Sequence, residues 1–145
     1  MSTEANKALV DRYYQEFWSE GNVAVADEIF DPNVSFYSPV DPDGIHGAGD
    51  LSAFVVRLRE SFPDLNFTIL DRVVTGDKVV YRWVLHGTHL GVYAAIPPTG
   101  NTITLEGMSL FYVADGKITQ IFSYIDLMRL VSLFDGEFPR SLKPG

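Results

Sequence analysis

The stretch Gly107-Met-Ser-Leu-Phe-Tyr-Val-Ala-Asp-Gly-Lys-Ile118 decides the fold. Its Asp115-Gly116 pair predicts a type I′ turn, because such a turn needs positive φ at both central residues and Asp-Gly adopts it at little cost. The turn pairs a strand over 102–114 with a strand over 117–126. The sequence therefore predicts a β-hairpin of two long strands near the C-terminal end of the chain.

Upstream of this hairpin the hydrophobic pattern changes from helical to strand spacing near Leu65. The first predicted helix begins at Ser2 or Thr3 and ends at Gly21, and two more cover 23–30 and 51–62. Further strands are predicted over 34–37, 66–74 and 79–89, and residues 38–44, with two prolines and a glycine, predict a loop. Residues 127–134 predict a closing helix, and the tail beyond Asp135 is predicted to be loose. Helices followed by antiparallel strands indicate an α+β fold, with N-terminal helices packed on a strongly curved, mixed but mostly antiparallel sheet. Such a sheet forms a cone with an internal pocket.

Length and composition restrict the possible functions. With 145 residues the chain is predicted to be one domain, 1–145. Its net charge of −8 argues against nucleic acid or an anionic membrane as partner. The absence of cysteine excludes a disulfide framework and a thiol nucleophile, and no stretch has membrane-spanning length, so a cytoplasmic protein is expected. Ten Phe, seven Tyr and two Trp exceed the needs of a small core, so some rings are expected to line a cavity.

Four sequence features resemble one family. Gly87-Thr-His-Leu-Gly91, Ile96-Pro-Pro-Thr-Gly100, Asp115-Gly-Lys-Ile118 and Asp126 before an apolar helix are similar to the SnoaL-like polyketide cyclase group of the nuclear-transport-factor-two-like superfamily. The resemblance implies a cone-shaped α+β domain whose cavity accepts hydrophobic polycyclic substrates. It also implies an acidic residue on the last strand as general acid/base, with no cofactor and no metal. Asp126 is the matching position.

Asp126 has two compatible interpretations. An Asp immediately before a helix is a frequent N-cap. A carboxylate beside an apolar pocket can also act as a general base that removes a proton α to a carbonyl. One carboxylate oxygen can cap the helix while the other faces the cavity.

The three histidines are candidate metal ligands or catalytic residues. His86 and His89 are an odd number of residues apart on an extended strand, so they point to opposite faces and cannot chelate one metal ion. His46, in the loop before the third helix, is a candidate for substrate contact or proton shuttling at the mouth of the cone. His89 is either a structural hydrogen-bonding residue that fixes the Pro-Pro loop or a substrate contact. No metal site is expected.

Counting back from the hairpin turn predicts which residues face the pocket. Without a bulge, Ser109 lies opposite Phe122, Gly107 opposite Tyr124, and Leu105 opposite Asp126. Small residues opposite rings leave room for a cavity, although Gly107 is also compatible with a bend in the sheet. The predicted substrate-binding residues are Tyr14, Trp18, Phe36, Phe54, Trp83, His89, Ser109, Phe122 and Tyr124; for the rings among them, plain core packing is the alternative.

The resulting functional hypothesis is a cofactor-independent cyclase or isomerase, or a related lyase, that acts on a hydrophobic polyketide-like carbonyl substrate. Asp126 is the base, and Tyr124, Ser109 or His46 polarise oxygens. The alternatives are non-catalytic binding of a hydrophobic small molecule, a dimerisation module, and epoxide hydrolysis by carboxylates around Arg82, for which no second inward carboxylate is identified. A homodimer is expected through the outer sheet face, which is predicted to carry Val84, Met108, Leu110, Tyr112, Ile121 and Ile125.

Overall fold

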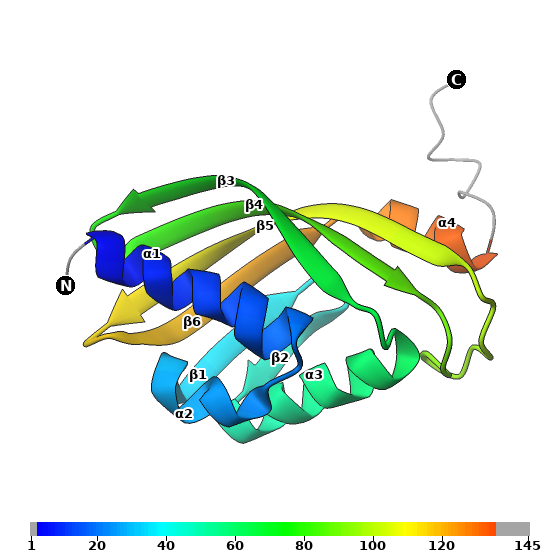
Figure 1. The fold of residues 1–145 in the computed structure, drawn as a ribbon, viewed down its shortest axis with the longest axis horizontal. Helices are drawn as coiled ribbons and strands as arrows, with labels where there is room; N and C mark the ends of the chain where they lie inside the picture. Colours follow the sequence, from blue (N-terminus) through cyan, green and yellow to red (C-terminus); the bar gives the residue numbers. More distant parts are fainter. Residues whose placement is uncertain (1–2, 136–145) are drawn as a thin grey trace.

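The computed structural model describes residues 3–135 (Figure 1). Its helices are α1 (Thr3–Arg12), a π-helical segment η1 (Tyr13–Ser19), a 3₁₀ turn η2 (Val23–Val25), α2 (Ala26–Ile29), α3 (Ala48–Ser61) and α4 (Leu127–Asp135). Its strands are β1 (Phe30–Ser38), β2 (Asp41–His46), β3 (Asn66–Thr75), β4 (Lys78–Thr88), β5 (Thr102–Ala114) and β6 (Lys117–Ile125). The predicted loose tail beyond Asp135 lies outside the described residues.

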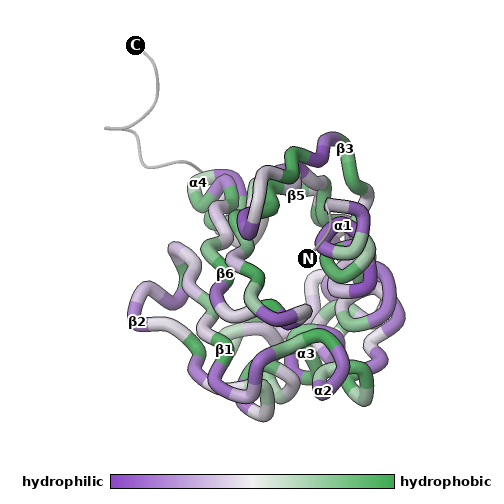
Figure 2. Tube along the Cα trace, turned by 90° about the vertical axis from the view of Figure 1, so that its left-hand side faces the viewer, coloured by the Kyte–Doolittle hydropathy of each residue, from purple (hydrophilic) through white to green (hydrophobic). Residues whose placement is uncertain are grey.

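The six strands form one mixed sheet that does not close on itself. Their order is β2-β1-β6-β5-β4-β3, with β1 parallel to β6 and all other neighbours antiparallel. Figure 2 shows the sheet curving from β3 round to β1 and β2, with α1 and α3 on its inner side. The α+β architecture with N-terminal helices on a curved sheet is thus as predicted. In the part of the chain that is described, no helix is long and apolar enough to cross a bilayer.

The first helix changes geometry halfway along. After α1, the η1 segment continues with π-type turns and buries four rings: Tyr13, Tyr14, Phe17 and Trp18. The guanidinium of Arg59 holds the end of this segment, since it donates hydrogen bonds to the carbonyls of Trp18 and Ser19 at 3.0 Å each. π-helical segments occur frequently at functional sites. Here the segment directs a row of aromatic side chains into the interior.

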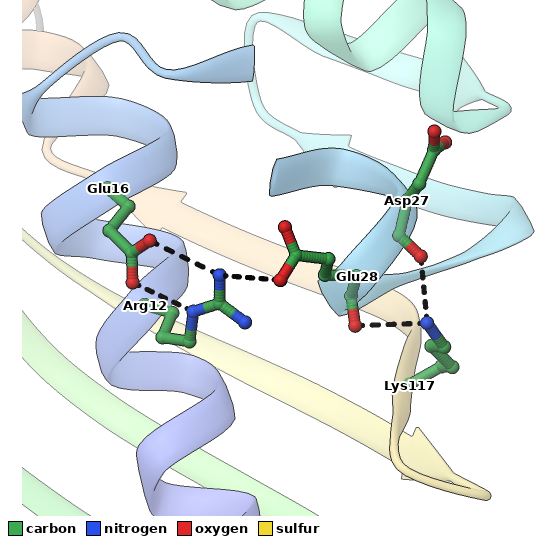
Figure 3. A network of polar contacts seen from close by, with 5 residues as sticks. All are labelled: Arg12, Glu16, Asp27, Glu28 and Lys117. Atoms are coloured by element: carbon green, nitrogen blue, oxygen red, sulfur yellow. Dashed lines mark hydrogen bonds and ion pairs between the residues drawn. The ribbon is translucent and has the colours of Figure 1, made fainter. Parts of the chain in front are cut away.

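A polar network ties the N-terminal helices to the sheet (Figure 3). Arg12 pairs with Glu16 one turn along the helix at 2.8 Å and with Glu28 of α2 at 3.2 Å. The ammonium of Lys117, at the start of β6, donates to the carbonyls of Asp27 and Glu28. Exposed ion pairs stabilise little individually. The network therefore serves mainly to fix α2 against η1 and β6.

The predicted loop over 38–44 is wrong in its second half. Asp41–His46 forms the edge strand β2, paired antiparallel with β1. Pro42 is compatible with this strand because an edge strand has one side without ladder hydrogen bonds. Gly44 takes φ +90°, and a Cβ there would lie 2.6 Å from the ring of Tyr37. The sequence pattern of turn residues therefore concealed a strand.

The hairpin turn is confirmed, but the register beyond it is shifted. Asp115 and Gly116 both take positive φ, 51° and 75°. A β-bulge follows, because Val113 pairs with Ile118 whereas Tyr112 pairs with Gln120, so Thr119 is the extra residue. From that point every side chain of β6 faces opposite to the predicted direction.

Candidate functional site

An apolar cavity of about 90 Å³ lies between the inner face of the sheet and the helices. Five predicted aromatic residues are in its wall: Tyr14, Trp18, Phe36, Phe54 and Trp83; the predicted Ser109 is there too. The other wall residues are Tyr13, Ser38, Val40, Leu58, Phe62, Leu65, Phe67, Leu85, Tyr93, Ile103, Leu105, Ser123, Ile125 and Leu130. None of these side chains carries a formal charge at neutral pH.

The cavity extends to the end of the sheet where β1, β4 and β6 end and β2, β3 and β5 begin, and we refer to this end as its mouth. Three connecting elements contribute wall residues there: Val40 from the β1–β2 turn, Tyr93 from the β4–β5 connection, and Leu130 from α4. Figure 1 shows α4 and the β4–β5 connection at this end of the molecule. Access to the cavity therefore depends on loops and a terminal helix rather than on the sheet.

A short chain of hydrogen bonds crosses the cavity floor. The indole N–H of Trp83 donates to Ser109 Oγ at 3.0 Å, and Ser109 Oγ donates to Ser123 Oγ, also at 3.0 Å. Ser109 and Ser123 are direct cross-strand partners on β5 and β6. Gly107 makes this possible, because a Cβ at that position would lie 2.4 Å from the ring of Trp83. The small residue therefore accommodates the indole instead of leaving empty space.

Three further polar atoms in the wall are buried and have no hydrogen-bond partner among the described residues: Tyr14 Oη, Trp18 Nε1 and Ser38 Oγ. Burial raises the pKa of Tyr14 well above its ordinary value of 10, and the neighbouring Ser109 and Trp83 offset only part of this. These two neighbours are close to the Tyr14 hydroxyl without meeting hydrogen-bond geometry. Tyr14 is therefore a neutral hydrogen-bond donor inside an apolar cavity.

Asp126 is not in the cavity wall, but it is adjacent in sequence to wall residues. It follows Ile125 and precedes Leu130 by one helical turn, and both of those residues are in the wall. Asp126 Oδ1 accepts a hydrogen bond from the backbone N–H of Arg129 at 3.0 Å, which confirms the predicted N-cap. Oδ2 has no hydrogen bond in the described part of the chain, and the residue is exposed. One oxygen of the carboxylate thus caps α4 while the other is available.

His46 does not lie at the mouth of the cavity. Its ring is exposed on β2, where Nδ1 lies 3.3 Å from Ser35 Oγ and Nε2 lies 3.1 Å from the carbonyl of Asp43. It faces a separate polar hollow together with Asp50 and Arg57. Because the predicted loop is a strand that carries His46 away from this end of the sheet, the prediction that His46 lies at the mouth of the cone is wrong.

Of the two roles predicted for His89, the structure shows the first: its ring holds the loop that contains Pro97 and Pro98. It is fully buried, and its Nδ1 accepts a hydrogen bond from the backbone N–H of Thr99 at 3.3 Å and lies 3.0 Å from the Thr99 hydroxyl. Its backbone N–H and carbonyl bond to Asn101 and Gly100. These contacts close the β4–β5 connection that carries Tyr93. His89 is not in the cavity wall.

Phe122 and Tyr124 lie on the outer face of the sheet, so their predicted place in the pocket is wrong. The bulge at Thr119 turns them outward, and they pair with Leu110 and Met108. Phe122 stacks on Tyr37, with ring centroids 5.2 Å apart, and Tyr124 is 64% exposed. The inward positions are taken by Ser123 and Ile125 instead.

The arginine proposed as the centre of an epoxide-hydrolase site also faces outward. Arg82 pairs with Asp71 at 2.8 Å and with Glu106 at 3.7 Å, and its side chain is 43% exposed. This places two carboxylates around an arginine, but outside the cavity. Within residues 3–135 no group of three His, Asp or Glu side chains is arranged as metal ligands would be.

Ser123 is a polar wall residue that the sequence did not predict. It is buried, lines the cavity, and ends the hydrogen-bond chain that starts at Trp83. Its inward direction depends on the bulge at Thr119, which has no glycine, asparagine or proline to indicate it. The only available signal was a polar residue, Ser123, among the apolar residues of the strand.

Comparisons with known proteins agree with this architecture. A family model described as SnoaL-like polyketide cyclase matches residues 8–132. A protein from Jannaschia sp. CCS1 assigned as a SnoaL-like polyketide cyclase has 26% identity and a TM-score of 0.85, covering 93% of this chain and 94% of that one. A protein from Acidithiobacillus ferrooxidans assigned as a polyketide cyclase has 27% identity and a TM-score of 0.83, covering 94% and 99%.

A third similar structure indicates how widely the fold is used. AclR from Streptomyces galilaeus, assigned as a hydroxylase, has a TM-score of 0.81 at 20% identity, covering 97% of this chain and 88% of that one. At this identity the likeness concerns the fold alone. Comparison with curated protein sequences gave no match.

Proposed function

The chain belongs to the SnoaL-like polyketide cyclase family, and we propose that it is a cofactor-independent cyclase or isomerase acting on an apolar carbonyl compound. The observation that carries the proposal is the pairing of two features at one cavity. The wall is apolar and contains hydrogen-bond donors, and Asp126, next to the wall residue Ile125, has one carboxylate oxygen without a hydrogen bond among the described residues; we place this oxygen at the rim of the cavity. A carboxylate base at the edge of the cavity and hydrogen-bond donors within it suit the removal of a proton from the carbon next to a carbonyl group, because the donors can hold the carbonyl oxygen while the base takes the proton.

In the proposed reaction, Asp126 Oδ2 takes a proton from the carbon next to the carbonyl. The electron pair of the C–H bond moves to the carbonyl oxygen, and the resulting enolate is stabilised by hydrogen bonds from the cavity wall. The enolate carbon then attacks a second carbonyl in a cyclisation or takes a proton back in an isomerisation. A substrate seated at the rim also excludes water from the carboxylate, which strengthens its attraction for the proton.

The size of the cavity limits how the substrate binds. Pockets that enclose drug-sized ligands usually measure about 300–1,000 Å³, whereas this cavity measures about 90 Å³. One ring of a polyketide-like compound is the most that enters without a change in the walls. We propose that the rest of the substrate lies at the mouth, and that Val40, Tyr93 and Leu130 move apart to admit it.

Non-catalytic binding of a hydrophobic small molecule is the main alternative. It needs the same cavity but no base, so Asp126 would then act only as the cap of α4. Epoxide hydrolysis has less support, because the carboxylates around Arg82 face away from the cavity.

The proposal is tested by proton exchange, which does not require the natural substrate. Acetophenone is a single-ring ketone, and its methyl protons exchange slowly with D₂O in neutral solution. The protein is expected to accelerate deuterium incorporation into this methyl group, followed by proton nuclear magnetic resonance, in a saturable manner. No acceleration over protein-free buffer would favour non-catalytic binding.

We also propose that the protein is a homodimer through the outer face of the sheet. This face carries Met108, which is 48% exposed, and Tyr124, beside the half-buried Leu110, Tyr112 and Phe122. The predicted face included Ile121 and Ile125, but the bulge turns these inward and substitutes Phe122 and Tyr124. The patch stays apolar, and such patches commonly mark interfaces.

A further inference from the structure

We infer that the floor of the cavity is a binding subsite for a single hydrogen-bond-accepting oxygen of an apolar ligand, with Tyr14 and Ser123 as the two donors. The ligand oxygen is a carbonyl or enolate oxygen. The inference rests on the proposed function, since it assigns the residues that would hold the carbonyl oxygen of that reaction. It adds Ser123, which no sequence feature indicated, and gives a role to the chain that starts at Trp83.

The hydrogen-bonded series Trp83–Ser109–Ser123 has one proton without an acceptor. Trp83, Ser109 and Ser123 together supply three N–H or O–H protons, and the chain contains two hydrogen bonds. An indole N–H only donates, so Ser109 must accept from Trp83. Since Ser109 donates to Ser123, the remaining proton is that of the Ser123 hydroxyl. Ser123 is in the cavity wall and has no further hydrogen-bond partner among the described residues.

Tyr14 supplies a second unused proton at the same place. Its side chain is 3% exposed, and its hydroxyl has no hydrogen-bond partner in the described part of the chain. The η1 segment orients it, because Tyr14 stacks on Tyr81 and meets the ring of Phe67. Its hydroxyl lies near Ser109, the direct cross-strand partner of Ser123, and both Tyr14 and Ser123 line the cavity. The two protons are therefore available within one apolar enclosure.

The composition of the wall defines what fits. Buried donors without acceptors cost stability, so a group that accepts both protons binds favourably there. The wall residues include no Asp or Glu, so the cavity has no carboxylate to pair with an ammonium group. A carbonyl oxygen has two lone pairs and suits two donors, and an enolate oxygen suits them better because charge strengthens the bonds. The subsite thus favours ketones and their enolates over hydrocarbons of the same shape.

Water is the competing occupant. The cavity of about 90 Å³ is well above the roughly 10–15 Å³ that one water needs, and a water could accept both protons. The inference therefore needs a test in which only the acceptor oxygen of the ligand changes. Acetophenone and α-methylstyrene form such a pair, because the second replaces the carbonyl oxygen with a CH₂ group of similar shape.

Binding is followed through the fluorescence of Trp18 and Trp83, the two tryptophans of the chain, both in the cavity wall. Tyr14→Phe and Ser123→Ala are each expected to weaken acetophenone binding about three- to tenfold, the effect of losing one neutral hydrogen bond. Neither variant should weaken binding of α-methylstyrene, which also verifies that each variant folds with its cavity intact. The control is Tyr112→Phe, on the outer face, which should leave both affinities unchanged.

Unchanged acetophenone affinity in both variants, equal losses for the two ligands, or no binding of acetophenone to the wild-type protein would overturn the inference. In those cases the donors hold water or serve the core alone. The outcome is separable from that of the proton-exchange assay. If the protein catalyses exchange but the variants bind acetophenone as the wild type does, the subsite is wrong and the proposed reaction stands. If the variants lose acetophenone affinity but the protein catalyses no exchange, the subsite stands and the proposed reaction is wrong.

Discussion

Ser109 and Ser123 lie directly opposite each other across β5 and β6, with their hydroxyl oxygens 3.0 Å apart at the floor of an apolar cavity. A hydroxyl pair at this position is costly unless every proton has an acceptor. Trp83 satisfies one lone pair of Ser109, and the proton of Ser123 remains for a ligand. This pair therefore links the stability of the sheet to the chemistry of the cavity.

Ser109→Ala is expected to destabilise the protein by about 1–3 kcal/mol, because it leaves the buried N–H of Trp83 without an acceptor. Denaturation by urea measures the change. The double variant Trp83→Phe/Ser109→Ala removes both partners and should lose less than the sum of the two single changes. A strictly additive result would show that the 3.0 Å contact contributes nothing specific.

Alkaline conditions are expected to destabilise the fold through its buried tyrosines. Burial raises the pKa of Tyr14 well above 10, and burial also raises the pKa values of Tyr13 and Tyr81. A tyrosine whose folded pKa is raised contributes its full stability below the unfolded value near 10, and loses it as the pH rises toward the folded value. Above about pH 10, the unfolded chain releases protons that the folded chain retains.

Tyr14→Phe should reduce this pH dependence by one proton. The slope of the free energy of unfolding against pH becomes shallower by about 1.4 kcal/mol per pH unit once the unfolded tyrosine is ionised. Urea denaturation of both proteins at a series of pH values above 10 measures the difference. Parallel curves for the two proteins would mean that Tyr14 is not held in its neutral form by the fold.

The proposed dimer is tested by placing a charge in the outer face. Met108→Lys introduces an ammonium group into the apolar patch formed with Tyr124 and should shift a wild-type dimer toward monomer in analytical ultracentrifugation. The side chain is 48% exposed in the single chain, so the fold itself should tolerate the change. A wild-type monomer at micromolar concentration would contradict the proposed interface.

Much of the fold could be predicted because it depends on local signals. Asp115-Gly116 specified a turn that the structure contains, and helical spacing up to Trp18 specified a buried stripe. Asp126 before an apolar run specified the cap of α4, which its bond to Arg129 confirms. Each of these features is determined by a few neighbouring residues.

The site could be predicted only in part because it depends on register. The bulge at Thr119 exchanged Phe122 and Tyr124 for Ser123 and Ile125 on the inner face. A bulge needs no special residue when the sheet around it is strongly twisted, so the sequence has no mark of it. Pairing along a sheet is a property of both strands and of the core beneath them, which a single strand does not encode.

His46 was misplaced for a related reason. Proline and glycine over 38–44 indicated a loop, but an edge strand tolerates both, and β2 formed there. The additional pairing with β1 carried His46 to a separate hollow on the surface.

The capping role of Asp126 adds a stability effect that must be separated from catalysis. Asp126→Ala removes the acceptor for the backbone N–H of Arg129 and should cost about 1 kcal/mol. Asp126→Asn keeps an oxygen that can accept the same bond, so its stability should stay close to that of the wild type. The Asn variant is therefore the informative one.

The exchange of acetophenone methyl protons with D₂O by Asp126→Asn tests the central claim most directly. Exchange should slow by about a hundred- to ten-thousandfold, the usual range for loss of a general base, while binding measured by tryptophan fluorescence is retained. Asp71→Asn, on the outer face beside Arg82, is the matched control and should exchange at the wild-type rate. An Asp126→Asn protein that exchanges as fast as the wild type would show that Asp126 is a helix cap and not the base.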